Sequence, residues 1–191
     1  MDQETGLIER AKNGERAAFD SLVDMHKEKA FALAFSFIGN VEDAKDVLQE
    51  AFVKAYVGVI NFRGSSKFYT WLYRILVNQC KDFLRKKKAK SGVFLDPLPI
   101  SEEDGDGVPE AVDPAPLPSQ AVLDRETRQM INEAISGLPE KQKAVFMLKH
   151  IQGMKLNEIA ETVGCSESTA KVHLFRAVRG LRCKLTKSLT I

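Results

Sequence analysis

Basic and aromatic residues are closely interleaved between residues 62 and 90, a combination suited to binding an opened nucleic-acid strand. The segment carries nine lysines or arginines and six aromatic residues against one acid, Asp82. Aromatic faces stack on unpaired bases at about 1–3 kcal/mol each, while lysine and arginine hold the phosphates. A base turned out of its stack also needs a pocket with polar edges, for which Asn78 and the Ser65–Ser66 loop are candidates.

Part of this segment must also build a hydrophobic core. Helical spacing assigns five residues to that core: Phe68, Leu72, Ile75, Leu76 and Phe83. Trp71, Tyr69 and Tyr73 cannot all face it, so some aromatic surface is expected to remain available. The run of basic residues from Arg85 to Lys88 fits either phosphate binding or a solvated helix end.

A second constellation near the C-terminus has the layout of a helix-turn-helix. Ala160 is small enough for two helices to approach closely, Gly164 can adopt the positive φ of a tight turn, and Ser166 can cap the second helix. That helix would enter the major groove with its N-terminus first. Four residues would then reach base edges and phosphates: Glu167, Ser168, Thr169 and Lys171.

The charge of this C-terminal region agrees with a DNA-binding function. From residue 171 to the end there are six basic residues and no acid: Lys171, Arg176, Arg179, Arg182, Lys184 and Lys187. His173 lies among them and is a candidate phosphate contact. The alternative is a structural helical hairpin with a solvated basic face, but the coincidence of geometry and charge favours DNA binding.

Residues 43–52 are acidic, in contrast to the two basic regions described above. The polar face of the helix expected there is acidic with an amide, so it would repel DNA and is predicted either to bind protein or to be solvated. From the residues alone, the solvated interpretation is favoured.

Nothing in the sequence indicates an enzyme, a metal site or a cofactor. The three histidines, His26, His150 and His173, form no metal-binding frame, and no glycine-rich phosphate loop is present. Three widely spaced cysteines, Cys80, Cys165 and Cys183, form no CxxC pair. We therefore predict no catalytic residues, no metal and no cofactor.

Helical periodicity runs through both halves of the chain, and no segment alternates as a strand should. We predict an all-α fold of two small helical domains, residues 1–90 and 120–191. Helices are expected at 3–13, 15–38, 41–58, 66–88, 119–136, from Pro139 to near Gly153, at 156–163 and at 166–187. Asn40 is expected to be the N-cap of the third helix.

Residues 91–119 separate the two predicted domains. They hold six of the seven prolines and seven acids but no lysine or arginine, which predicts a flexible acidic linker. The net charge of +2 thus divides into +4 before the linker, −7 within it and +5 after it, so both domains favour a polyanionic partner. Without a membrane-length apolar run or a secretion signal, the protein is expected to be soluble and cytoplasmic.

These residues resemble the extracytoplasmic-function group of alternative sigma factors, the subunits that direct bacterial RNA polymerase to promoters. The resemblance rests on DAKDVLQEAFVKAY, FRGSSKFYTWLYRILVN and LPEKQKAVFMLKHIQGMKLNEIAETVGCSESTAK, and it is closest to envelope-stress members. It implies core polymerase and promoter DNA as partners, an anti-sigma factor bound to the membrane, and control of a stress or envelope regulon.

The resemblance also implies a role for each motif. The first motif would contact the polymerase clamp through Asp43, Asp46, Gln49, Glu50 and Phe52, in place of a merely solvated face. The second would open and capture the minus 10 element through Phe62, Ser65, Ser66, Lys67, Phe68, Tyr69, Trp71, Arg74, Asn78 and, beyond the motif, Arg85. The helix-turn-helix at 156–175 would bind the minus 35 element through Ser166, Glu167, Ser168, Thr169, Lys171 and His173, followed by Arg176 and Arg179.

The recognition helix departs from the family pattern. Where many relatives have Ser-Arg after the lysine and Arg-Ala-Arg further on, this chain has Val172-His173 and Arg176-Ala177-Val178. Two basic side chains are therefore missing, and the upstream sequence recognised is expected to differ.

The main alternative is a conventional helix-turn-helix regulator that acts without being a polymerase subunit. Its N-terminal half should hold a sensor or dimerisation domain. The all-helical, basic and aromatic first half does not fit the alternating strands and helices of a receiver domain.

Overall fold

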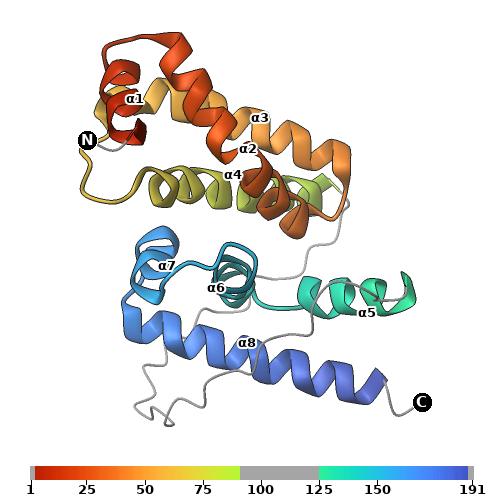
Figure 1. Ribbon diagram of the computed structural model, residues 1–191. Helices are drawn as coiled ribbons and strands as arrows, with labels where there is room; N and C mark the ends of the chain where they lie inside the picture. The colour runs from red at the N-terminus through yellow and green to blue at the C-terminus, as the bar shows by residue number, and fades with distance from the viewer. Residues whose placement is uncertain (1–2, 91–124, 189–191) are drawn as a thin grey trace.

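The computed structural model describes residues 3–90 and 125–188, and this part of the chain is helical without strands, as predicted. The first group of helices is α1 (Gln3–Lys12), α2 (Arg16–Ile38), α3 (Val41–Gly58) and α4 (Phe68–Lys90), with a short 3-10 turn at Val59–Asn61. The second group is α5 (Arg125–Ser136), α6 (Glu140–His150), α7 (Leu156–Val163) and α8 (Glu167–Ser188). In Figure 1 the two groups form two tiers, and α4 runs along the boundary between them. The linker predicted at 91–119 lies outside the described residues.

Local signals in the sequence define the break between α2 and α3. Gly39 has φ 77° and its N–H donates to the carbonyl of Phe35 at 2.7 Å, which ends α2. Asn40 then caps α3, because its Oδ1 accepts from the N–H groups of Glu42 at 2.9 Å and Asp43 at 3.1 Å. The predicted N-cap is confirmed.

The core of the first group is built by leucines from α2 and α4 and by alanines from α3. Leu22, Leu33, Leu72 and Leu76 are fully buried, and so are the alanines at 44, 51 and 55. A helix face of alanines lets α2 and α4 approach α3 closely. Phe68, Leu72 and Leu76 are core residues as predicted, whereas Ile75 and Phe83 are only partly buried.

The predicted helix-turn-helix is present at α7 and α8. Gly164 has φ 76° at the turn, and the Oγ of Ser166 accepts from the N–H of Thr169 at 3.1 Å, so it caps α8. Ala160 and Ala170 are buried where the two helices pack. The helix predicted from Pro139 to Gly153 is shorter, because Pro139 has an extended ψ of 145° and the chain leaves the helix after His150.

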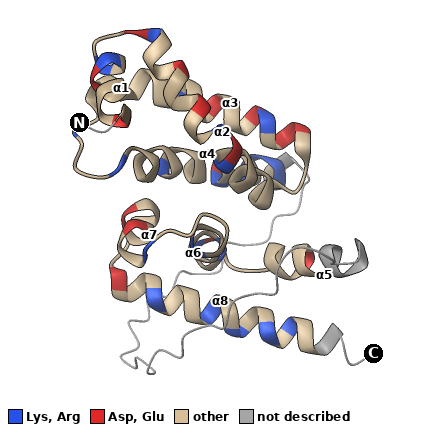
Figure 2. Cartoon of the chain, viewed as in Figure 1, with Lys and Arg blue, Asp and Glu red and all other residues tan. Residues whose placement is uncertain are grey.

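The two groups of helices pack against each other, with α4 contacting α7 and α2 contacting α6. The Nζ of Lys143 is buried at this boundary and donates to the carbonyl of Phe37 at 3.0 Å. Gln152 donates to the carbonyl of Lys29 at 2.8 Å. Figure 2 shows basic residues spaced along α8, whereas α2 and α3, in the other tier, carry both acidic and basic residues. None of the described helices combines the length and hydropathy needed to cross a membrane.

Candidate nucleic-acid interface

A cavity of about 200 Å³ lies where the loop before α4 meets the first turns of that helix. The loop contributes residues 61–63 together with Ser65 and Ser66, and α4 contributes Thr70, Trp71 and Arg74. Glu161 of α7 also lines it. Polar groups, an indole ring and a guanidinium therefore surround one small space, as a site for a single nucleobase requires.

Thr70 places a hydrogen-bonding group at this cavity that was not among the predicted site residues. Its side chain is 1% exposed, and among the described residues its Oγ1 has no hydrogen-bond partner. A buried hydroxyl without a hydrogen-bond partner is costly, which makes Thr70 a candidate partner for a ligand bound in this cavity. The sequence contained one signal: Thr70 is the polar member of the buried helical series that continues with Tyr73, Val77 and Cys80.

The aromatic residues of the segment divide into core residues and exposed ones. Phe68 is 3% exposed and packs between His26, Phe62 and Trp71, so the expectation that it contacts DNA directly is corrected: it supports the site from the core. Phe62 is also buried but lines the cavity. Tyr73 is buried, and desolvation raises the pKa of its hydroxyl to about 12. Trp71 and Tyr69 remain partly exposed.

Three further polar residues predicted for this surface lie on the exposed side of α4. Arg74 is exposed and lines the cavity. Asn78 is exposed one turn further along the helix and does not line the cavity, so the structure separates it from the loop serines. Arg85 is exposed and pairs with Asp82 at 2.7 Å.

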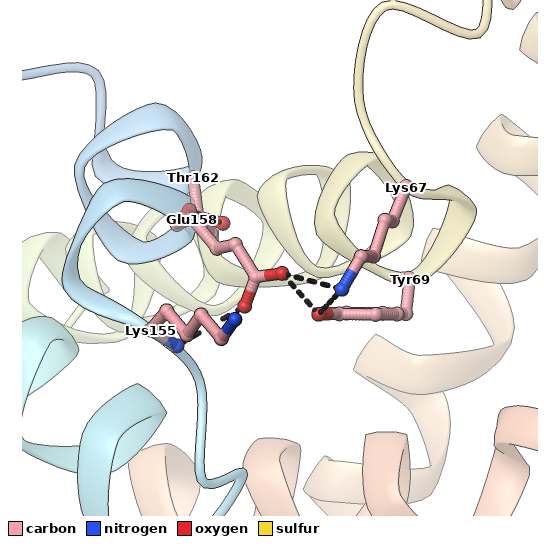
Figure 3. Close-up of polar contacts among 5 residues, drawn as sticks. All are labelled: Lys67, Tyr69, Lys155, Glu158 and Thr162. Carbon is pink, nitrogen blue, oxygen red and sulfur yellow. Dashed lines mark hydrogen bonds and ion pairs between the residues drawn. The ribbon is translucent and has the colours of Figure 1, made fainter.

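Lys67 and Tyr69 are occupied by a carboxylate from the second group of helices (Figure 3). The Oε1 of Glu158 accepts from the Tyr69 hydroxyl at 2.6 Å and lies 2.9 Å from the Lys67 Nζ. Its Oε2 accepts from the backbone N–H of Lys155 at 3.0 Å. Burial opposes ionisation of Glu158, but the hydrogen bonds from Tyr69 and Lys67 outweigh it and lower its pKa. The hydrogen bond to Glu158 likewise raises the pKa of Lys67.

The acidic face of α3 lies beside an apolar groove that composition did not reveal. Asp46 and Gln49 are exposed, Asp43 pairs with Lys87 at 2.8 Å, and Glu50 accepts from Gln79 at 2.8 Å. The groove measures about 560 Å³ and runs between α2 and α3. Its apolar lining consists of Phe19, Val23, Leu48, Phe52, Val53 and Tyr56. Val53 is 58% exposed there, which is typical of a surface that binds another protein.

The first turn of α8 presents the side chains predicted to read DNA. Glu167, Ser168, Thr169 and Lys171 are all exposed, and Arg176 and Arg179 follow them on the surface. His173, in contrast, is partly buried, and burial, followed by the charges of Lys141 and Arg176, lowers the pKa of its imidazole. The predicted contact of His173 with phosphate stays a prediction, because a partly buried imidazole still has an N–H group that can donate to a phosphate.

Within the part of the chain that the structure describes, no three histidine, cysteine or acidic residues gather as metal ligands would.

Solved structures share this fold. The structure of CnrH in complex with the cytosolic domain of CnrY has a TM-score of 0.71 at 24% identity, covering 97% of this chain and 99% of that one. The sigma factor RpoE from Bartonella quintana, solved with the anti-sigma factor NepR, has a TM-score of 0.65 at 24% identity, covering 88% and 96%. At this identity the likeness concerns the fold alone.

Sequence comparison identifies the family. Residues 22–90 match Sigma-70 region 2, and residues 128–181 match Sigma-70, region 4. The ECF RNA polymerase sigma factor SigW of Bacillus subtilis (strain 168) is 36% identical over 178 residues, 93% of this chain and 94% of the relative. The ECF RNA polymerase sigma-E factor of Escherichia coli (strain K12) is 35% identical over 173 residues, 90% and 88%. The chain therefore belongs to the extracytoplasmic-function family of RNA polymerase sigma factors, non-enzymatic proteins that act in transcription initiation.

Proposed function

We propose that this sigma factor divides promoter recognition among three surfaces. The groove between α2 and α3 binds the polymerase clamp, the cavity at the start of α4 captures a base of the minus 10 element, and the first turn of α8 reads the minus 35 element. The observation that carries the proposal is the cavity, because it joins the unpartnered Thr70 hydroxyl to the Trp71 ring and the Arg74 guanidinium.

The minus 10 surface extends outward from this cavity. Ser65, Ser66 and Phe62 line the cavity, while Lys67 and Tyr69 stand beside the loop. A base turned into the cavity would stack on the half-buried Trp71, and the phosphates on either side would reach the exposed cations. Asn78 and Arg85 lie further along α4, so we assign them to neighbouring nucleotides.

The clamp surface combines an apolar groove with an acidic rim. Phe52 is partly buried and Val53 is exposed, so both provide apolar area, and Asp46 and Gln49 lie at the surface of α3. An apolar centre with polar residues around it is the usual anatomy of a protein interface. Asp43 and Glu50 already pair with α4, so they orient α3 as well as facing outward.

The minus 35 surface uses the N-terminal end of α8 in the major groove. Glu167, Ser168, Thr169 and Lys171 are exposed at that end, and Ser166 holds it in place as the cap. Arg176 and Arg179 would bind phosphate further along. The exposed lysine and arginines carry most of the phosphate contacts that we propose for this helix, and the partly buried His173 lies among them.

Domain organisation and regulation belong to the same proposal. We place the domain boundaries at residues 90 and 120, with the acidic segment between them following the polymerase toward the RNA exit path. We also infer an anti-sigma partner, since RpoE was solved with the anti-sigma factor NepR and CnrH with the cytosolic domain of CnrY. The attachment of such a partner to the membrane is implied only by the family resemblance. The protein would act in the cytoplasm, where its polymerase is, on a stress or envelope regulon.

The test is run-off transcription with purified core polymerase on a library of genomic fragments. We expect transcripts from discrete sites that share two spaced elements, and we expect Trp71→Ala and Asn78→Ala to abolish them. Phe35→Ala is the matched control, because Phe35 is an exposed aromatic residue outside the three surfaces. Absence of start sites, with tight sequence-specific duplex binding by the free protein, would support the conventional regulator instead.

The clamp surface is tested separately by core polymerase binding. Val53→Glu places a charge in the apolar groove and should weaken binding at least tenfold without lowering the melting temperature, because Val53 is exposed. Ile151→Glu adds the same charge at an exposed apolar residue after α6 and should bind normally. Equal binding by both variants would place the clamp contact elsewhere.

A further inference from the structure

The Glu158 cluster joins the two groups of helices at two residues of the proposed minus 10 surface. We propose that α7 is an internal competitor for promoter DNA. In the free protein, Glu158 and Glu161 occupy positions that the DNA strand needs, and the minus 10 surface opens only when α7 moves away. This inference rests on the proposed function of that surface.

The contacts of Glu158 resemble those expected of a phosphate. A single carboxylate oxygen accepts from the Tyr69 hydroxyl at 2.6 Å and lies 2.9 Å from the Lys67 ammonium. An ammonium and a hydroxyl converging on one anionic oxygen would bind a phosphate oxygen in the same way. Glu158 and a nucleic-acid phosphate therefore exclude each other at this position.

Glu161 also blocks the cavity in which the base is proposed to bind. It lies three residues after Glu158, so both side chains project from the same side of α7. Glu161 lines the cavity together with Trp71 and Arg74, the groups assigned to a captured base. One helix thus meets both parts of the minus 10 surface, the phosphate position and the base position.

The two carboxylate oxygens of Glu158 make different contacts. Oε2 accepts from the Lys155 N–H at 3.0 Å and so caps α7, whereas Oε1 holds Lys67 and Tyr69. Capping requires only an acceptor, which glutamine also has, but the contact with Lys67 requires the negative charge. Glu158→Gln therefore separates the competition with DNA from the stability of α7.

The rest of the boundary is suited to opening. Lys143 donates to the Phe37 carbonyl from a buried position, and burial lowers the pKa of Lys143 and of Lys81. Burying an ammonium costs desolvation free energy, which reduces the net stability of the packed arrangement. The helices that line the groove, α2 and α3, belong to the tier opposite α7 (Figure 1), so polymerase can bind there before the boundary opens.

The first test measures binding of a fluorescent random-sequence single-stranded 12-mer to the full-length protein across a range of salt concentrations. Glu158→Gln should bind about 3- to 10-fold more tightly than the unaltered protein. Because one further cation becomes available, its plot of log affinity against log salt should steepen by about 0.7. Glu9→Gln is the charge-matched control, since Glu9 pairs with Lys12 on α1.

The outcomes separate this inference from the proposed function. If Glu158→Gln binds the 12-mer no more tightly than Glu9→Gln while Lys67→Ala weakens binding, the proposal that α7 competes with DNA is wrong. The proposed minus 10 surface is then supported. If Lys67→Ala does not change the affinity for the 12-mer, the proposed minus 10 surface is wrong. The proposal that α7 competes with DNA for that surface is then wrong as well. A gain in Glu158→Gln that disappears in the Lys67→Ala/Glu158→Gln double variant supports both.

The second test detects the contact itself with a carbodiimide, which joins a neighbouring amine and carboxylate as an amide. We expect a Lys67–Glu158 crosslink in the free protein and its loss in the complex with core polymerase and a promoter fork. Lys12 and Glu9 on α1, whose Nζ and Oε1 atoms lie 3.1 Å apart outside the three proposed surfaces, should crosslink in both states. A missing Lys67–Glu158 crosslink in the free protein, or one that persists on the promoter, would overturn the inference.

Discussion

At the scale of the residue, the role proposed for Thr70 depends on the burial of its hydroxyl. Its hydroxyl is buried without a partner among the described residues, so the folded protein gains nothing from it. Thr70→Val should leave the melting temperature unchanged or raise it. It should also reduce open-complex formation about 2- to 10-fold, the equivalent of one hydrogen bond of about 0.5–1.5 kcal/mol.

The control for this change is Thr162→Val on α7. Thr162 is equally buried, but its hydroxyl donates to the Glu158 carbonyl at 2.8 Å. We expect that variant to form open complexes normally. If Thr70→Val behaves in the same way, the captured base does not use the Thr70 hydroxyl.

Two histidines of the second group of helices make stability depend on pH. Burial, followed by the charge of Lys149, lowers the pKa of His150, and burial, followed by Lys141 and Arg176, lowers that of His173. The unfolded chain therefore binds more protons as the pH falls. Stability is fully present above the unfolded pKa of about 6.5 and is lost as the pH falls from there toward the lowered folded pKa.

Urea unfolding at about pH 7.5 and about pH 5.5 measures this loss. The unaltered protein should be less stable at the lower pH. The double variant His150→Gln/His173→Gln should lose less stability over the same interval, because its side chains do not titrate. An identical loss in both proteins would show that other groups are responsible.

At the scale of the element, α3 depends on its N-cap. Asn40 accepts from two N–H groups of the first turn, so Asn40→Ala should lower the free energy of unfolding by about 1 kcal/mol. Asn40→Asp keeps an acceptor oxygen at the same position and should retain most of the stability. Thermal unfolding compares the two, and equal losses would mean that the cap contributes little.

At the scale of the whole molecule, binding of polymerase should separate the two groups of helices. Hydrogen exchange followed by mass spectrometry tests this with core polymerase and no DNA. Exchange should slow over residues 41–57, where the clamp is proposed to bind. It should accelerate over residues 155–163 and 67–74, because the contact between Glu158 and Lys67 is released. Unchanged exchange in those two segments would mean that the boundary stays closed on the polymerase.

The local features of this protein could be read from the sequence. The cap at Asn40, the turn at Gly164 and the cap at Ser166 are confirmed, because each depends on residues within a few positions of one another. Helical periodicity likewise predicted most helix bounds to within two residues. The linker interval and the individual DNA and clamp contacts stay predictions.

Only the tertiary structure decided which of these side chains are free to act. Phe68 and Tyr73 are buried in the core, and burial lowers the pKa of the partly buried His173. The cavity, the groove and the Glu158 contact each join separate elements; Tyr69 and Glu158 stand 89 positions apart. Periodicity assigns a residue to one face of its own helix, but it does not say which helix covers that face. Packing therefore decides whether the proposed minus 10 surface is accessible, whereas the residues between 62 and 85 already determine which chemical groups it contains.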